Sequence, residues 1–350
     1  MGQLALSKIK NMAKVLLTGV TGFLGSHTAI QLLNKGYEVV GTLRDIRRSE
    51  SIRSVLAQHT ENIQNLSFAE ADLMDKSIWN RLTDGVDYVQ HIASPFPRTL
   101  PKNEEELIKP AVHGVLSIME AASKNKVKRV VLTSSSGAIV YGKDKGKASQ
   151  TFTEKDWTDT QNKKDSTPYF RSKTKAEKAA WNFIQNDKSG LELSTVCPGA
   201  ILGPVLEEDF GTSANIVIKV LDGSTPAIPR IGFDMVDVRS VADLLILAME
   251  KPEAANERFI GSSGFLSFKQ VADYLREAYP KRKIPKFPLP NFMVRLIANF
   301  DKTLKPILID LGVERKVDNS KAKNLLGWKP LDNREAVLSC AESVIKLGLA

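Results

Sequence analysis

The N-terminal part of the chain alternates between short apolar runs and amphipathic segments, and this alternation constrains the fold more than any other feature. The apolar runs, rich in β-branched residues, predict buried strands at 15–18, 38–43, 66–69, 86–91, 130–134 and 192–196. The amphipathic segments predict helices at 25–35, 49–59, 107–124 and 169–185. Such a sequence predicts an α/β fold, with a doubly wound parallel sheet covered by helices on both faces.

Three glycines follow the first predicted strand, where the first predicted helix begins. Gly19 permits a tight turn, Gly22 lets the backbone approach a pyrophosphate, and Gly25 lets the helix pack on the strand. The helix N-terminus then presents free N–H groups and a positive dipole end to the phosphates. The loop therefore predicts a dinucleotide site, although Thr21 stands where a Gly-x-Gly-x-x-Gly sequence has its second glycine.

The end of the second predicted strand distinguishes NAD from NADP. An acid there accepts hydrogen bonds from the ribose hydroxyls of NAD, whereas an arginine accommodates the 2′-phosphate of NADP. Leu43 stands where the acid is expected, Arg44 follows it, and Arg48 adds positive charge nearby. Asp45 is the counter-evidence, because a shift of one residue would make it the ribose acid. We predict NADP (NADPH) as the cofactor, in preference to NAD.

Beyond residue 201 the pattern loosens into short elements separated by prolines and glycines, with helices predicted at 241–249, 268–279 and 334–347. We expect an N-terminal tail at 1–13, a Rossmann-type dinucleotide-binding domain at 14–201 and a smaller C-terminal substrate lobe at 202–350. Segment 234–250 is expected to pack back on the Rossmann domain.

Tyr169 and Lys173 lie four residues apart on a predicted helix, so they share one face. Reduction of a carbonyl requires a proton for the alkoxide that develops as hydride arrives, but a free tyrosine, with a pKa of about 10, is a poor acid at neutral pH. We expect the ammonium of Lys173 to lower the pKa of Tyr169 and to donate to the nicotinamide ribose.

Three hydroxyls, Ser134, Ser135 and Ser136, end a predicted strand at the carboxyl edge where α/β sheets bind ligands. One of them would hold a substrate carbonyl beside Tyr169, while another would bond its own backbone. These features together predict hydride transfer from a nicotinamide cofactor to the carbonyl of a small aldehyde or ketone.

With these motifs in this order, the chain resembles the extended short-chain dehydrogenases/reductases. More closely it is similar to the dihydroflavonol reductase-like group of NADPH-dependent aldehyde and ketone reductases. The resemblance covers about residues 14–348 and rests further on the stretches 71–73, 91–96, 169–181, 196–199, 236–243 and 317–328.

The resemblance implies roles for individual residues. Ser135 matches the catalytic serine, and Tyr169 and Lys173 match the catalytic pair, which also contacts the cofactor. The other expected cofactor contacts are Gly19, Thr21, Gly22, Phe23, Leu24, Gly25, Arg44, Arg48, Asp72, Leu73, Ala93, Ser94, Pro198, Gly199, Ile201 and Ser213.

The substrate pocket is expected between the sheet edge and the C-terminal lobe. Phe96, Tyr141 and Phe170 are candidate walls, although the same aromatics would fit a core equally well. Family members that reduce dihydroflavonols usually have Asn or Asp where this chain has Val140, and the cinnamoyl-CoA reductase signature is absent. The resemblance therefore implies a general aldehyde or ketone reductase.

Composition limits the partners. The net charge of +9 is spread along the chain without interleaved aromatics, the apolar runs are too short to span a bilayer, and two cysteines with four scattered histidines give no metal spacing. We expect a cytoplasmic monomer or homodimer that binds no nucleic acid, membrane or metal. Two alternatives stay open: an NAD-dependent sugar-nucleotide epimerase or hydroxysteroid-type dehydrogenase, and a catalytically silent nucleotide-binding subunit.

Overall fold

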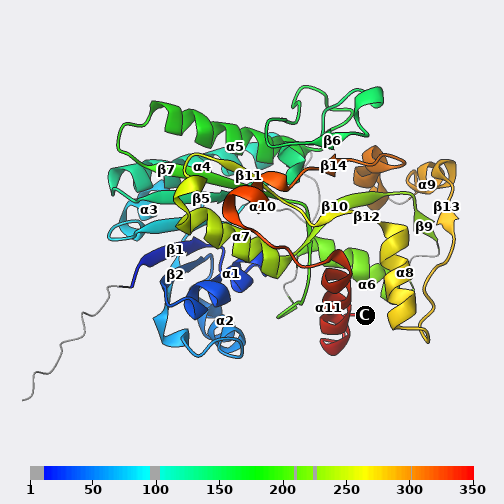
Figure 1. Cartoon of the computed structure of the whole chain (residues 1–350), viewed down its shortest axis with the longest axis horizontal. Coiled ribbons are helices and arrows are strands. Elements are labelled where there is room, and N and C mark those ends of the chain that lie inside the picture. Colours follow the sequence, from blue (N-terminus) through cyan, green and yellow to red (C-terminus); the bar gives the residue numbers. More distant parts are fainter. Residues whose placement is uncertain (1–11, 95–102, 209–210, 224–226, 301) are drawn as a thin grey trace, which may run out of the picture.

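The main domain is built on one seven-stranded parallel sheet (Figure 1), in a computed structural model that describes residues 12–94, 103–208, 211–223, 227–300 and 302–350. The strand order is β11-β7-β5-β4-β1-β2-β3. The strands are β1 (Lys14–Thr18), β2 (Glu38–Leu43), β3 (Leu66–Glu70), β4 (Tyr88–His91), β5 (Arg129–Thr133), β7 (Glu192–Pro198) and β11 (Arg258–Gly261). The predicted doubly wound parallel sheet is confirmed, and its order reverses between β1 and β4, where such sheets bind ligands.

Helices cover both faces of this sheet. One face carries α1 (Phe23–Asn34), α2 (Ser49–Leu56) and α7 (Val238–Glu250), whose apolar residues share one buried cluster with the strands. The other face carries α3 (Lys76–Leu82), α4 (Glu105–Lys124) and α5 (Pro168–Asn186). Both faces of the sheet are therefore buried, which is why its strands are apolar almost throughout.

The C-terminal lobe contains a second, three-stranded sheet of order β12-β10-β8, formed by β8 (Ala200–Leu202), β10 (Gly232–Asp237) and β12 (Gly264–Ser267). Three helices share a core with it: α6 (Asn215–Leu221), α8 (Phe268–Ala278) and α11 (Asn333–Lys346). Two short pairs complete the sheets, β6 (Thr151–Phe152) with β14 (Lys316–Val317) and β9 (Ile228–Pro229) with β13 (Pro288–Leu289). The remaining α-helices are α9 (Asn291–Ile297) and α10 (Ser320–Leu326).

The chain passes between the two lobes more than once. Strand β11 extends the main sheet by pairing with β7, and α7 packs against α1 on that sheet. Both elements lie beyond residue 201, the predicted end of the Rossmann domain, and α7 falls within the segment 234–250 that was expected to pack there. The main domain therefore takes residues from both sides of the predicted boundary.

Candidate active site

The glycine loop after β1 leaves no room for side chains at two of its three glycines. Gly19 has a φ of +74°, in the left-handed region that favours glycine. A Cβ on Gly25 would lie 2.0 Å from the carbonyl oxygen of Gly19, whereas a Cβ on Gly22 would meet only that oxygen, at 3.4 Å. The turn thus requires glycine at position 19, and the close contact between α1 and the Gly19 carbonyl requires glycine at position 25. The space beside Gly22 is open to a ligand.

The N-terminus of α1 is available to an anion. Its N-cap residue is Gly22, which makes no side-chain cap bond, and the first turn has no acidic residue. The N–H groups of Phe23, Leu24 and Gly25 therefore have no capping acceptor, and they coincide with the positive end of the helix dipole. A pyrophosphate fits this end of the helix, so the residues present suit the predicted dinucleotide.

A buried hydroxyl–imidazole pair fixes the loop that faces Gly19. Thr18 Oγ1 accepts hydrogen bonds from the backbone N–H groups of Ile92 and Ala93, both at 3.0 Å, and lies 2.9 Å from Nδ1 of His91. Because Thr18 accepts twice, its own proton points to His91, whose Nδ1 must be the acceptor. Burial lowers the pKa of His91 to about 3, so the ring stays neutral and keeps this role at physiological pH.

The charged residues after β2 do not act alike. Asp45 accepts two side-chain hydrogen bonds from Arg47, at 2.8 Å each, and caps the short 3-10 helix that follows it. Arg48 pairs with Glu207 at 3.0 Å, whereas Arg44 is exposed. Asp45, the residue that would favour NAD, is therefore engaged by an arginine, while the guanidinium of Arg44 lies open to solvent at the end of β2.

The hydroxyl of Ser135 lies close enough to the phenol of Tyr169 to influence its pKa. Thr167 caps α5 and Pro168 occupies its first turn, so Tyr169 projects from the start of the helix. Ser135 also accepts from the N–H of Gly137 at 3.0 Å. Burial raises the pKa of Tyr169 to about 12, although the hydroxyl of Ser135 opposes this increase. The expected lowering of this pKa by Lys173 is not found, because burial dominates.

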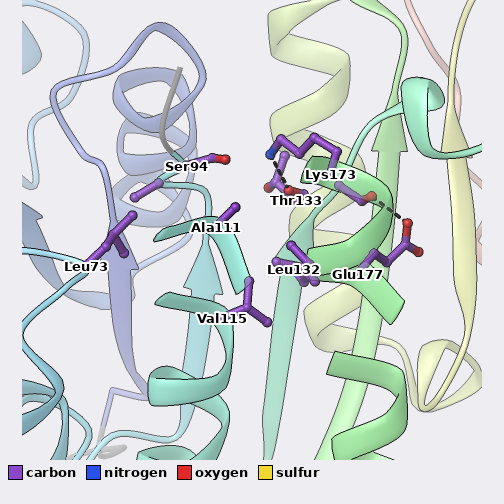
Figure 2. A pocket seen from close by; sticks show the side chains of 11 residues that line it. Leu73, Ser94, Ala111, Val115, Leu132, Thr133, Lys173 and Glu177 are labelled. Carbon is purple, nitrogen blue, oxygen red and sulfur yellow. Dashed lines mark hydrogen bonds between the residues drawn. The ribbon is translucent and has the colours of Figure 1, made fainter. Parts of the chain in front are cut away.

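Lys173 lies on the same face of α5 but contacts a different group. Its Nζ donates to the backbone carbonyl of Thr133 at 3.2 Å, and burial lowers its pKa to about 8. Figure 2 shows Lys173 on the wall of a small cavity of about 10 Å³, with Ser94 and Leu73 on the opposite side. Leu73, Ser94 and Lys173, three predicted cofactor contacts from the segments after β3 and β4 and from α5, are thus brought together at one sheet edge.

One helical turn below Lys173, the carboxylate of Glu177 is fully buried. It accepts from Ser134 at 2.5 Å and from Thr195 at 2.9 Å, and it pairs with Arg258 of β11 at 2.6 Å. Ser134 therefore serves this buried network, which leaves Ser135 as the hydroxyl beside Tyr169.

The aromatic residues predicted for the substrate pocket differ in position. Phe170 is partly exposed and stacks on Tyr141, with ring centroids 3.8 Å apart. Tyr141 is buried, with Arg315 over its ring and its hydroxyl bonded to Asp310. Tyr141 is thus packed against Phe170 in the interior, and its place in a substrate pocket stays a prediction, while Phe96 lies outside the described residues.

The remaining predicted contacts surround the same edge. The exposed Asp72 accepts from the N–H of Met74 at 2.7 Å after β3. Gly199 packs so closely on β10 that a Cβ would lie 2.2 Å from the carbonyl oxygen of Asp234. Pro198 is in β7 and Ile201 is in β8. Thr21 lies in the glycine loop. Ser213 lies in a 3-10 turn next to Gly211, which contacts Phe23 of α1.

A model of the NAD dependent epimerase/dehydratase family matches residues 15–260. The chain belongs to this family. Among its curated relatives are tetraketide alpha-pyrone reductase 1 of Arabidopsis thaliana, 35% identical over 78% of this chain and 83% of that protein, and anthocyanidin reductase ((2S)-flavan-3-ol-forming) of Vitis vinifera, 33% identical over 89% and 96%. These relatives confirm the resemblance to extended, dihydroflavonol reductase-like enzymes.

Solved structures of family members agree with this fold. Yeast methylglyoxal/isovaleraldehyde reductase Gre2, complexed with NADPH, superposes with a TM-score of 0.76 at 28% identity, covering 96% of this chain and 99% of that chain. Vestitone reductase from alfalfa also has a TM-score of 0.76, at 25% identity over 95% and 99%.

Neither a metal-binding cluster nor a membrane-spanning helix is found in the part of the chain that the structure describes. No group of three or more His, Cys, Asp or Glu side chains is placed to hold a metal ion. Among the described helices, none is long and apolar enough to cross a bilayer.

Proposed function

We propose that this protein is an NADPH-dependent reductase that transfers hydride to the carbonyl of a small aldehyde or ketone. The observation that carries the proposal is the grouping of Ser135, the phenol of Tyr169 and the buried amine of Lys173 at the sheet edge next to the uncapped N-terminus of α1. A nucleotide site and an acid–base pair thus share one edge. A catalytically silent subunit would have no need of the second feature.

When bound, the cofactor supplies the hydride. Ser135 positions the carbonyl oxygen of the substrate, and the phenol of Tyr169 gives its proton to that oxygen as negative charge develops. The pKa of Tyr169, raised to about 12 by burial, keeps the phenol protonated at neutral pH, so it is ready to act as an acid. This protonation state favours the direction of reduction.

Lys173 has two roles in this proposal. Its ammonium donates to the nicotinamide ribose and stabilises the negative charge left on Tyr169 after proton transfer. With a pKa of about 8, most Lys173 side chains are charged at pH 7, and the Thr133 carbonyl orients them.

The preference for NADPH rests on the residues after β2. Arg44 is exposed at the strand end and can bind a 2′-phosphate, while Arg47 occupies the carboxylate of Asp45. A similar protein of Candida albicans is named a putative NADPH-dependent methylglyoxal reductase, and its name also supports a small carbonyl substrate. Val140 is buried and apolar at the position where family members that reduce dihydroflavonols usually have Asn or Asp, which favours a different carbonyl substrate.

The test uses purified protein, NADPH and a set of small aldehydes, diketones and ring ketones, followed by NADPH absorbance. Tyr169→Phe should leave NADPH affinity nearly unchanged and lower single-turnover reduction by about a hundredfold to ten-thousandfold. Ser135→Ala should lower the same rate, whereas Ser136→Ala is the matched control and should not. Single-turnover reduction by Tyr169→Phe at the wild-type rate would refute the mechanism, and no reduction by the wild type would refute the function.

A further inference from the structure

Exposed apolar side chains are concentrated on one short stretch of the C-terminal lobe. In the part of the chain that the structure describes, eleven large hydrophobic residues are exposed, and six of them lie within residues 287–300. These six are Phe287, Phe292, Met293, Leu296, Ile297 and Phe300. Such a concentration marks a contact surface, because isolated exposed hydrophobics are common but clustered ones are not.

The cluster forms one face of α9 and of the turn that follows it. Val294 and Ala298 are buried and attach the helix to the lobe. Phe292, Leu296 and Phe300 are spaced four residues apart on the outer side, with 71%, 58% and 86% of their surfaces exposed. We call the exposed side chains of Phe292, Met293, Leu296, Ile297 and Phe300 the α9 face. It consists of aromatic and aliphatic groups.

The charged residues of the segment that leads into and forms the α9 face are all basic. Residues 281–300 contain five basic residues and no acidic residue, namely Lys281, Arg282, Lys283, Lys286 and Arg295. Arg282 is tied to backbone carbonyls of Leu221 and Ala350, while the other four are exposed. The partner of this face therefore combines an apolar interior with negative charge at its surface.

Neither a second copy nor the N-terminal tail has that chemistry. A symmetric dimer would bring the α9 face and its basic residues against an identical set, and the like charges would repel. Residues 1–11 contain Lys8 and Lys10 and no acidic residue. They also precede β1, which Figure 1 shows far from α9 along the long axis of the molecule.

We propose that the α9 face docks on the surface of an anionic lipid bilayer. The aromatic and aliphatic side chains enter the boundary between headgroups and acyl chains, while Arg295 on α9 and the exposed lysines of the preceding segment bind lipid phosphates and carboxylates. A fluid bilayer admits these side chains without a preformed groove, which a protein partner would have to supply. This mode requires no spanning helix, so it is compatible with the absence of one among the described residues.

The orientation leaves the nucleotide edge accessible. Figure 1 shows α9 at the end of the C-terminal lobe, while the main sheet occupies the other end of the molecule. The docked enzyme would therefore keep its glycine loop toward water. The amine and hydroxyl groups of the site lie on α5 and in the turn after β5, and in this orientation they do not contact the lipid.

The test is sedimentation of the full chain with extruded vesicles, one set of phosphatidylserine with phosphatidylcholine and one of phosphatidylcholine alone. The wild type should bind the anionic vesicles at least about tenfold more tightly than the neutral ones, and added salt should weaken binding. The variant Phe292→Ser/Leu296→Ser/Phe300→Ser should lose about tenfold or more of this affinity. The matched control Met12→Ser/Leu325→Ser/Leu347→Ser removes three exposed apolar side chains elsewhere and should bind like the wild type.

Circular dichroism and urea unfolding test whether both triple variants are folded. We expect both to fold, because all six positions are exposed. Three results would overturn the proposal: no binding of the wild type to anionic vesicles, an equal loss of vesicle affinity in both triple variants, or equal affinity of the wild type for anionic and neutral vesicles. A wild-type dimer in sedimentation velocity that the α9-face variant abolishes would also overturn it, since a second copy would then cover the face. None of these readouts depends on the reductase activity.

Discussion

Loss of one partner from the ion pair between Glu177 and Arg258 should be among the most destabilising single changes in this fold. Both side chains are buried, with Nε of Arg258 2.6 Å from the carboxylate. Arg258 also donates to two backbone carbonyls and lies 3.7 Å from the centroid of the Trp157 ring. Removal of either partner leaves a buried charge uncompensated, which costs about 3–5 kcal/mol.

We expect Glu177→Gln and Arg258→Met each to lower the free energy of unfolding by about 3–5 kcal/mol. The double variant should lose far less than the sum of the two, because the second change removes the charge that the first left unpaired. The coupling energy from this cycle should therefore be about 2–3 kcal/mol. Urea unfolding followed by circular dichroism and by tryptophan fluorescence measures all four proteins.

An exposed pair serves as the control. Lys269 and Asp273 lie one turn apart on α8, 2.7 Å from each other and open to solvent. Asp273→Asn should change stability by less than about 1 kcal/mol. If the two buried changes prove additive within about 0.5 kcal/mol, the pair is not coupled and the reasoning from burial fails.

Acid should weaken the same pair. Burial alone would raise the pKa of Glu177, but Arg258 and the surrounding hydrogen bonds outweigh it and the net shift is downward. A depressed carboxyl pKa contributes stability above the unfolded value of about 4.3, and that contribution is lost as pH falls below it. The difference in stability between wild type and Glu177→Gln should therefore be constant near neutrality and shrink below about pH 4.

Three further predictions concern the glycine loop, the cofactor and a second buried carboxyl. Gly22→Ala should fold normally and weaken NADPH binding, measured by calorimetry, whereas Gly25→Ala should also lower the melting temperature because its Cβ would meet a carbonyl oxygen at 2.0 Å. Arg44→Glu should weaken NADPH by about 1.5–3 kcal/mol and NADH less, and equal losses would contradict the assignment. Burial raises the pKa of Asp234 to about 7, so the wild type should lose stability as pH rises from about 4 to 7, a slope that Asp234→Asn should flatten in urea titrations.

The main sheet could be predicted because each of its first strands carries its own signal. Six of the seven strands coincide with predicted apolar segments, and the helices between them have amphipathic faces. Strand β11 was not predicted, because it has only four residues and begins with Arg258 and ends with Gly261. The two residues between them are too few to form a recognisable apolar run. Its place is determined by pairing with β7 and by the Glu177 ion pair, both long-range contacts.

Site residues that share one helix could be predicted from their spacing in the sequence. Contacts between residues of different elements could not be predicted in this way. The spacing of Tyr169 and Lys173 continues four residues later to Glu177, and that repeat could have revealed the buried carboxylate. The pairing of Thr18 with His91 gave no such signal, because the two residues end different strands. The raised pKa of Tyr169 also could not be inferred, since it depends on how deeply the folded chain buries the phenol.

The position of β11 at the far end of the strand order affects how the protein can fold during synthesis. By the time residue 198 is made, six strands of the main sheet are complete, yet the edge of β7 has no neighbour until residues 258–261 arrive. Glu177 likewise has no guanidinium until Arg258 is translated. A nascent chain that ends between these points carries an open strand edge and an unpaired acid in its core, so the ribosome-bound intermediate should be the form most in need of chaperones.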